Sequence, residues 1–157
     1  MRTTENICIE FDGDGDDDID FQRLEKLLHA VCTEFHVLNV HIQISLVDDA
    51  QMIEVHQQFL NDNSTTDVMS FDLSDDYEDQ SNFQIVVNCD MARRQAEKRG
   101  HSVLSELALY MTHGLLHQLG FDDHDPQDAQ KMHEKEDAVL QSHRFGVIYH
   151  KQDNNQE

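Results

Sequence analysis

Polar and apolar residues alternate at several places along the chain, and each alternation predicts a β-strand. The clearest one covers residues 38–46, in which every second residue is leucine, valine or isoleucine. Shorter alternations cover residues 7–11 and 83–87, and the sequence Thr-Asp-Val-Met-Ser-Phe at 66–71 predicts a further strand. Four strands are therefore expected.

Helical spacing, in which apolar residues are three and four positions apart, separates and follows these strands. Residues 21–35 show it most clearly. Asp90 is placed to begin a later helix that Gly100 ends, and Ser102 is placed to begin the next one. An Asp-Pro pair at 125–126 is a strong start signal for the last helix. The expected helices begin near residues 21, 49, 90, 103 and 126.

Two strands separated by helices, followed by two strands and then by helices, indicate an α+β fold with one mixed four-stranded sheet and about five helices. The helix after Ser102 is apolar over much of its circumference, so we expect it to be buried at the centre of the molecule. The length of 157 residues suits a single domain, 1–157. The acidic segment 12–20 is expected to be a solvated loop, and residues 151–157 a loose tail.

Two histidines on this central helix have the spacing of metal ligands. His113 and His117 are four residues apart, so a helix presents both imidazoles on one face. Gly120 is placed to end the helix, and residues 122–125, three aspartates and a histidine, can supply further ligands. Such a pair is common on helices without a metal, but the acidic turn directly after it favours a metal site. Because Gly114 follows His113, the sequence does not match the His-Glu-x-x-His metallopeptidases.

Residues 112–126 resemble the signature of the YbeY-type endoribonucleases, which runs His-Gly-x-Leu-His-Leu-x-Gly-Tyr-Asp-His. Residues 66–71 resemble the family's Thr-Asp-Val-Leu-Ser-Phe strand, and residues 94–102 resemble the segment that leads into its metal helix. In all, residues 38–145 read as this family, with several motifs in the same order. The resemblance implies the α+β arrangement expected above.

The resemblance also implies a function, a zinc-dependent endoribonuclease that holds one Zn²⁺ per chain and cuts single-stranded RNA. Its role would be maturation of the small-subunit rRNA 3′ end and ribosome quality control, with rRNA and small-subunit ribosomal proteins as partners. His113 and His117 would hold the zinc with a third ligand. Asp123 occupies the position of the family's third histidine, so it is the expected third ligand, and His124 beside it is the alternative. No residue is assigned as the catalytic base.

One departure from the family pattern favours a second hypothesis. The family has an arginine a few residues before its Thr-Asp-Val, and counting back from Thr66 that position is Leu60. Cleavage of a phosphodiester must stabilise extra negative charge, which a guanidinium does well. The alternative function is therefore a metal-stabilised ribosome assembly factor that binds a ribosomal protein and has no nuclease activity.

The net charge of −21 limits the possible partners, and no lysine or arginine lies between Lys26 and Arg93. Such a surface repels phosphate backbones, which argues against DNA binding and against non-specific binding of nucleic acid. RNA would need a local basic patch, a metal or a basic partner. Four basic residues of the helix that ends at Gly100 could form the patch, or could equally be a solvated face that pairs with acidic groups. They are Arg93, Arg94, Lys98 and Arg99.

The three cysteines, Cys8, Cys32 and Cys89, are widely separated and include no Cys-x-x-Cys pair. This pattern favours a reduced, cytoplasmic protein in which each thiol is a small buried apolar group. The N-terminal region has no long apolar run, so neither a signal peptide nor a membrane span is expected.

Overall fold

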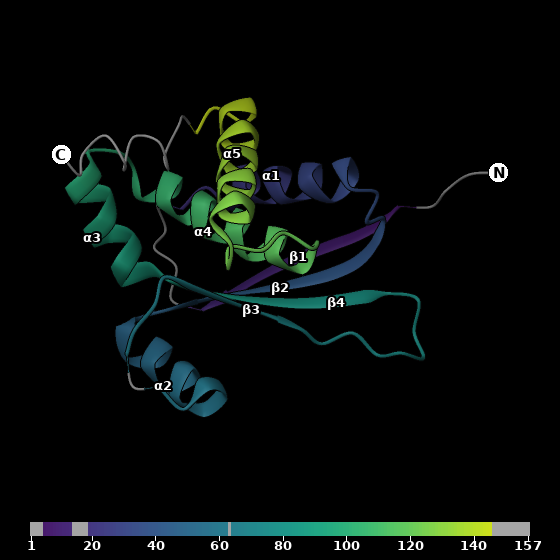
Figure 1. Ribbon diagram of the computed structural model, residues 1–157, viewed down its shortest axis with the longest axis horizontal. Coiled ribbons are helices and arrows are strands. Elements are labelled where there is room, and N and C mark those ends of the chain that lie inside the picture. The colour runs from purple at the N-terminus through teal and green to yellow at the C-terminus, as the bar shows by residue number, and fades with distance from the viewer. Residues whose placement is uncertain (1–4, 14–18, 63, 146–157) are drawn as a thin grey trace.

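The alternating and amphipathic segments of the sequence form a sheet covered by helices in the computed structural model (Figure 1). The structure describes residues 5–13, 19–62 and 64–145. Most of the expected acidic loop and the whole expected tail, 151–157, lie outside these residues. In chain order the elements are β1 (Asn6–Gly13), α1 (Phe21–Glu34), β2 (Asn39–Val47), α2 (Asp49–Leu60), β3 (Val68–Asp72), β4 (Ser81–Asn88), α3 (Cys89–Arg99), α4 (Val103–Gln118) and α5 (Pro126–Ser142).

The sheet is mixed, and its strand order is β1-β2-β4-β3. β1 is parallel to β2 and β2 is parallel to β4, whereas β3 runs antiparallel to β4 at one edge. Parallel neighbours need a crossover connection, and α1 provides the one between β1 and β2. The prediction of an α+β fold with one mixed four-stranded sheet and about five helices is confirmed for the part of the chain that the structure describes.

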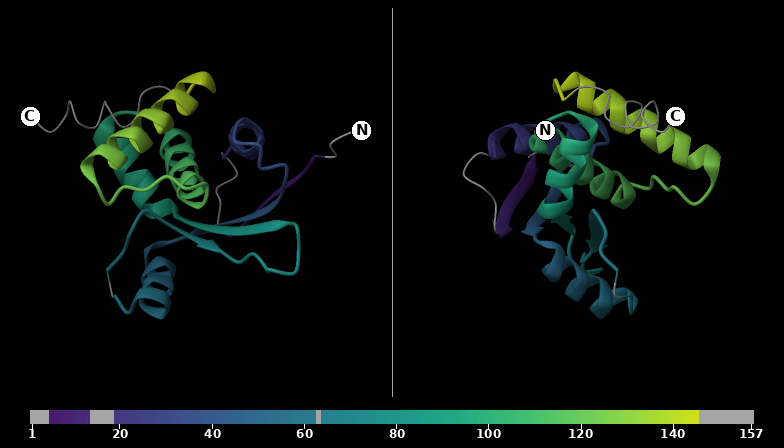
Figure 2. Two further views of the ribbon diagram at one scale, coloured as in Figure 1. Left: turned by 45° about the vertical axis from the view of Figure 1, so that its right-hand side comes forward. Right: turned by 90° about the vertical axis from the view of Figure 1, so that its left-hand side faces the viewer.

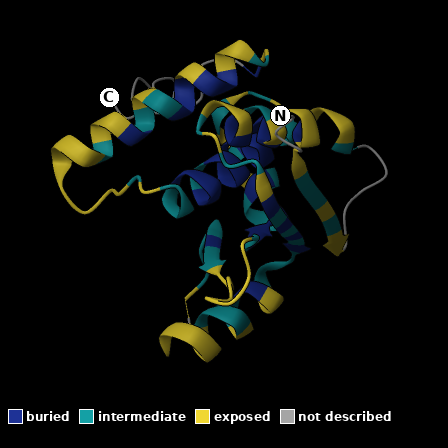
Figure 3. Cartoon of the chain, turned by 90° about the vertical axis from the view of Figure 1, so that its right-hand side faces the viewer, coloured by how far each residue is buried: buried dark blue, intermediate teal, exposed yellow. Residues whose placement is uncertain are grey.

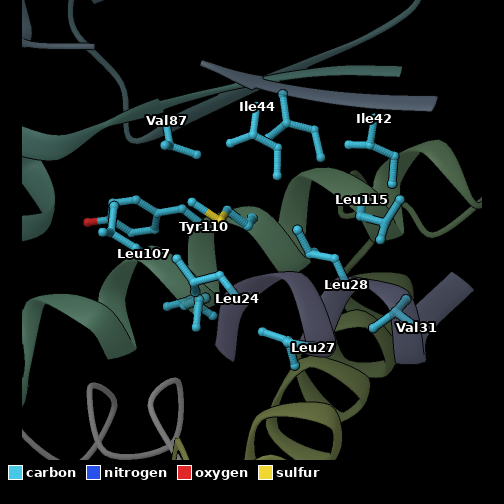
Figure 4. Packing of buried hydrophobic residues seen from close by; sticks show 14 of the residues in the cluster. Leu24, Leu27, Leu28, Val31, Ile42, Ile44, Val87, Leu107, Tyr110 and Leu115 are labelled. Carbon is cyan, nitrogen blue, oxygen red and sulfur yellow. The ribbon is translucent and has the colours of Figure 1, made fainter. Parts of the chain in front are cut away.

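The helices are divided unequally between the two faces of the sheet (Figures 1 and 2). Helices α1, α3, α4 and α5 lie together on one face, and α2 lies alone on the other. The main core lies beneath the four helices, where Leu28 of α1 and Leu115 of α4 pack near Ile42 and Ile44 of β2 (Figure 4). A smaller cluster beneath α2 consists of Met52, Met69 and Val86.

Helix α4 is the central helix, as predicted, and eleven of its sixteen residues are buried (Figure 3). It contacts β3 and β4 as well as α1, α3 and α5. The helix packs tightly against the sheet at Gly114, where an added Cβ atom would be 2.9 Å from Cγ2 of Ile85 and 3.2 Å from Cγ2 of Val68. In the described ranges, neither α4 nor any other helix is long and apolar enough to cross a membrane.

Several predicted ends of helices are confirmed. Ser102 is the N-cap of α4, and its side chain accepts a hydrogen bond from the backbone N–H of Ser105. Gly100 ends α3 with a left-handed φ of 74°. Asp125 is the N-cap of α5, which begins with Pro126. The loop that carries candidate ligands therefore ends at a well-defined helix start.

The prediction that Asp90 begins α3 is wrong, because Asn88 is the N-cap of this helix. Oδ1 of Asn88 accepts a hydrogen bond from the backbone N–H of Met91 at 3.1 Å. Strand β4 ends at Asn88 and α3 begins at Cys89, so no connecting residue remains and Asp90 lies in the first turn. There the Asp90 carboxylate accepts a hydrogen bond from the backbone N–H of Asp49, which begins α2.

Candidate metal centre

The end of α4 is defined by backbone hydrogen bonds that turn the chain back toward the helix. The backbone N–H of Phe121 donates to the carbonyl of Leu116 at 3.0 Å, and that of Gly120 donates to the carbonyl of His117 at 3.2 Å. This pair of bonds is a Schellman motif, which requires a positive φ at the residue after the cap. Gly120 has a φ of 103°, so the helix ends at Gln118 and its last two turns carry His113 and His117.

The structure brings both histidines together with Asp123. The Nε2 atoms of His113 and His117 are 3.1 Å apart, and each lies 3.8 Å from Oδ2 of Asp123. Ligand bonds of about 2.0–2.2 Å place neighbouring ligand atoms of a tetrahedral zinc ion about 3.3–3.6 Å apart. The three atoms therefore have nearly the separations that one metal ion would impose.

Hydrogen bonds to the other ring nitrogens orient both imidazoles. Nδ1 of His113 donates to Oε1 of Glu136 at 2.5 Å, and Nδ1 of His117 donates to the backbone carbonyl of Phe121 at 3.1 Å. Because each proton is then on Nδ1, each Nε2 lone pair is directed toward Asp123 and available to a metal. Two neutral imidazoles and one carboxylate are a donor set that fits zinc, with a fourth position left for water or substrate.

Glu136 is the principal support of this arrangement, although it lies on a different helix, α5. Its side chain is almost fully buried and also accepts a hydrogen bond from Nδ1 of His133 at 3.2 Å. Burial alone would raise the pKa of Glu136, but the bonds to His113 and His133 outweigh it and lower the pKa below the ordinary value. Burial likewise opposes protonation of His113, yet the bond and charge of Glu136 raise its pKa. The two shifts agree that Glu136 is a carboxylate.

His124, the alternative third ligand, lies away from the two histidines. Its side chain is 89% exposed, and its Nε2 lies 3.5 Å from Oδ1 of Asp122. Asp122, Asp123 and His124 form a second group of possible ligands, but all three are exposed. Of the two residues considered for the third position, the structure thus places Asp123, and not His124, beside His113 and His117.

A cavity of about 150 Å³ adjoins the candidate centre. It opens beside His113 and is bounded by residues from α3, α4, α5 and the segment before β3. Its lining combines carboxylates, a guanidinium, imidazoles and a phenol with apolar surface. The lining residues are Asp67, Arg99, Leu109, Tyr110, His113, His133 and Glu136.

Arg99 is held in this cavity by a buried acid, Glu106 of α4. Nη1 of Arg99 donates to both carboxylate oxygens of Glu106, at 2.8 and 3.0 Å, and Nε2 of His101 lies 2.5 Å from one of them. The Glu106 side chain has no exposed surface, and that of Arg99 is 11% exposed. Burial, and then the charge of Glu106, raise the pKa of Tyr110, so its hydroxyl stays neutral. A guanidinium carries five N–H donors, so Arg99 can bind an anion while it remains paired with Glu106.

The other predicted basic residues lie away from the cavity lining. Arg94 makes a bidentate ion pair with Asp49, with N–O distances of 2.6 and 3.0 Å, and Arg93 pairs with Asp90 at 3.0 Å. Lys98 is exposed. Of the four residues considered as an RNA-binding patch, Arg99 lines the cavity and the other three do not.

Four polar residues of this site, Asp67, Tyr110, His133 and Glu136, were not predicted from the sequence. One signal for Glu136 was present, because it lies on the inner face of α5 with the buried residues Met132 and Leu140. A carboxylate among apolar residues at helical spacing has to be paired when it is buried. Tyr110 had no comparable signal, since an aromatic residue on the buried face of α4 is equally well explained by packing.

Comparisons with known proteins identify relatives of this chain. The family model described as Endoribonuclease YbeY matches residues 12–144. Endoribonuclease YbeY of Leifsonia xyli subsp. xyli is 37% identical over 119 residues, covering 68% of this chain and 78% of its own. Endoribonuclease YbeY of Sulfurovum sp. is 30% identical over 147 residues, covering 90% of this chain and 93% of its own.

The fold is shared with a solved structure. The solution structure of TM1509 from Thermotoga maritima superimposes with a TM-score of 0.62, covering 96% of this chain and 94% of that one. The two sequences are 23% identical, so this similarity supports the fold alone.

Proposed function

This chain belongs to the YbeY endoribonuclease family, and we propose that it is a zinc-dependent enzyme that cuts single-stranded RNA internally. Its substrate would be the precursor of small-subunit rRNA, cut during maturation of the 3′ end and in ribosome quality control in the cytoplasm. Small-subunit ribosomal proteins are the proposed protein partners. Each chain would hold one zinc ion through His113, His117 and Asp123.

The convergence of the Nε2 atoms of His113 and His117 on Asp123 carries this proposal. Both imidazoles are held in the tautomer that a metal requires, one by Glu136 and one by a backbone carbonyl. A zinc ion in this position would supply Lewis acidity toward a phosphoryl oxygen or a water molecule.

Residues around the cavity have separate roles in the proposed reaction. Glu136 keeps the His113 ring in one tautomer and orientation through the 2.5 Å hydrogen bond. Arg99, which lines the same cavity as His113, offers a fixed positive charge to a phosphate group. Glu106 holds that guanidinium in place. The net charge of −21 weakens binding of RNA elsewhere on the surface, so recognition depends on this cavity and on a basic protein partner.

A specific observation supports the second candidate, an assembly factor without nuclease activity. Leu60, which stands where the resemblance places an arginine, lies at the end of α2 with 62% of its surface exposed. An exposed leucine cannot stabilise the charge of a transition state, but it can contact an apolar surface of a ribosomal protein.

Purified protein with measured zinc content, tested on end-labelled single-stranded RNA, distinguishes the two functions. We expect His113→Ala to bind one zinc ion per chain fewer than the wild type and to lose cleavage. Glu136→Gln should weaken zinc binding about 10- to 100-fold, because it alters only the orientation of a ligand. His29→Ala, on the exposed side of α1, is the matched control and should change neither.

The third ligand is tested by comparing Asp123→Ala with His124→Ala. Zinc content should fall in Asp123→Ala and be retained in His124→Ala, and the reverse result would assign His124. If wild-type protein whose His113, His117 and Asp123 centre holds zinc leaves RNA intact, and His113→Ala still supports ribosome maturation in cells, the assembly function is correct and the nuclease function is wrong.

A further inference from the structure

Three side chains capable of binding metal lie on the face of the sheet opposite α4. β1 and β2 are parallel, and Cys8 is paired in register with His41. Glu10 lies two residues after Cys8, so its side chain is on the same face of β1. The neighbouring pair, Ile9 and Ile42, points into the main core, which places Cys8, Glu10 and His41 on the other face.

The ligand atoms of these three residues converge. Oε1 of Glu10 lies 3.6 Å from Sγ of Cys8 and 3.5 Å from Nε2 of His41. All three atoms lie within 4.8 Å of one another. Zinc bonds of about 2.0 Å to nitrogen or oxygen and about 2.3 Å to sulfur place ligand atoms about 3.3–3.8 Å apart. Both measured distances to Glu10 lie in this interval. A small rotation of side chains would bring the distance between Sγ of Cys8 and Nε2 of His41 into it as well.

The chemistry of the three donors selects a class of ion. A thiolate with an imidazole and a carboxylate suits zinc and similar thiophilic divalent ions, and disfavours magnesium and calcium. A thiolate and a carboxylate also balance the charge of a divalent ion. The surroundings attract cations, because residues 27–92 contain no lysine or arginine. Further along the same face, Gln43 is hydrogen-bonded to another carboxylate, that of Asp12.

The surroundings of Cys8 make it a poor nucleophile at neutral pH. It is partly exposed, unlike Cys32, which is buried. Burial of the sulfur and the charge of Glu10 raise the pKa of the Cys8 thiol, which leaves little thiolate at neutral pH. A divalent ion displaces that proton when it binds, and the negative charge of Glu10 then favours the ion.

We propose that Cys8, Glu10 and His41 form a second metal site, for zinc or a similar thiophilic divalent ion, which links edge strand β1 to β2. The site shares no residue with the centre at the end of α4, so either can be occupied without the other. Its ion joins the two strands through side chains in addition to their backbone hydrogen bonds. Ion binding to the folded chain stabilises it, because these ligands are separated in the unfolded chain.

Titration with cobalt(II) tests this site directly. A cobalt–thiolate bond gives a charge-transfer absorption in the near ultraviolet, and the centre formed by His113, His117 and Asp123 contains no sulfur. We expect this absorption to appear with one equivalent of cobalt in full-length protein whose first centre is already loaded. Cys8→Ser should abolish the absorption, and His41→Ala should weaken cobalt binding at least about tenfold.

Cys32→Ala, which removes a buried thiol from the core, is the matched control and should retain the absorption. Circular dichroism of each variant establishes that it is folded. Zinc should also raise the thermal midpoint of His113→Ala, in which the first centre is removed, and should not raise that of His113→Ala with Cys8→Ser. The proposal is overturned if the wild type shows no thiolate absorption, or if the absorption persists in folded Cys8→Ser.

Discussion

Asn88 joins three segments of the chain through one amide side chain. Its Nδ2 lies within hydrogen-bond distance of Oδ1 of Asp49, Oγ1 of Thr65 and the carbonyl of Thr66, at 2.8, 2.9 and 3.2 Å. Its Oδ1 caps α3, and the side chain is completely buried. The starts of α2 and α3 and the residues before β3 are therefore positioned together. Because Thr66 and Asp67 are adjacent in the chain, Asn88 also helps to place one wall of the cavity.

Asp49, one partner of Asn88, has an unusually acidic side chain. Hydrogen bonds from Arg94 and then from Asn88 lower its pKa from 3.8 to about 2. Asp49 therefore stabilises the fold above pH 3.8, and this contribution is lost as the pH falls toward 2. We expect Asp49→Asn to lower the free energy of unfolding at neutral pH by about 0.5–1 kcal/mol, since the ion pair is partly exposed.

Urea unfolding at a series of pH values measures this effect. The difference between Asp49→Asn and the wild type should shrink as the pH falls from 3.8 to about 2. Glu54→Gln, an exposed substitution on the same helix, should show no such trend. An acid dependence that is identical in Asp49→Asn and in the wild type would contradict the role assigned to this carboxylate.

At the scale of the elements, local periodicity was sufficient to predict most strands and helices. β2 was predictable because the alternating apolar residues of its segment 40–46 face one core, and α4 because its apolar residues surround the helix. The start of α3 was not predictable, because Asp90 and Asn88 are both good N-cap residues. The choice between them depends on where β4 stops pairing with β2, and a local pattern does not contain that information.

The candidate site was predictable only where one helix carries it. His113 and His117 were proposed from their spacing of four residues, and Asp123 from its register with the third histidine of the family signature. Glu136 lies 23 residues from His113, and its contact depends on how α5 packs against α4. The sequence predicts Arg99 as part of a basic patch or solvated face of its helix, whereas its pairing with buried Glu106 places it in the cavity. Contacts between helices therefore account for what the sequence left unassigned.

The packing of α4 on the sheet predicts the effect of a substitution at Gly114. An alanine there would gain up to about 1 kcal/mol of helix propensity, but overpacking costs about 1–3 kcal/mol. Its methyl group would lie 2.9 Å from Cγ2 of Ile85, a branch next to the backbone that cannot easily move. We expect Gly114→Ala to lower the free energy of unfolding by about 1 kcal/mol in denaturant titrations.

Ile85→Leu provides the matched test, because leucine has a similar volume without the branch at Cβ. The double variant Gly114→Ala with Ile85→Leu should lose less free energy of unfolding than the sum of the losses in the two single variants. A Gly114→Ala protein that is more stable than the wild type would show that close packing does not select glycine here.

At the scale of the whole molecule, charge is the dominant property. The net charge is −21, and ion pairs such as Arg94–Asp49 and Arg99–Glu106 engage some of the few positive groups. Repulsion among the remaining acids destabilises the compact state. Salt screens this repulsion, over about 8 Å at physiological ionic strength.

We therefore expect the thermal midpoint to rise as potassium chloride is added to protein in dilute buffer. Replacing three exposed acids of the loop before β4, as Asp76→Asn, Glu78→Gln and Asp79→Asn together, should reduce this dependence on salt. Differential scanning calorimetry measures both midpoints. A midpoint that falls with salt would show that ion pairs outweigh the repulsion.

The strand order determines where copies of the chain can associate at high concentration. Among the described residues, β1 and β3 form the two edges of the sheet, and an open edge is a template on which another chain can aggregate. β3 is only five residues long, which limits pairing there, and the shared negative charge keeps copies of the chain apart. Repulsion between negative charges therefore has two effects: it destabilises each folded molecule, and it opposes association between molecules. Salt that screens the repulsion stabilises the fold but also weakens the opposition to fibril-like association.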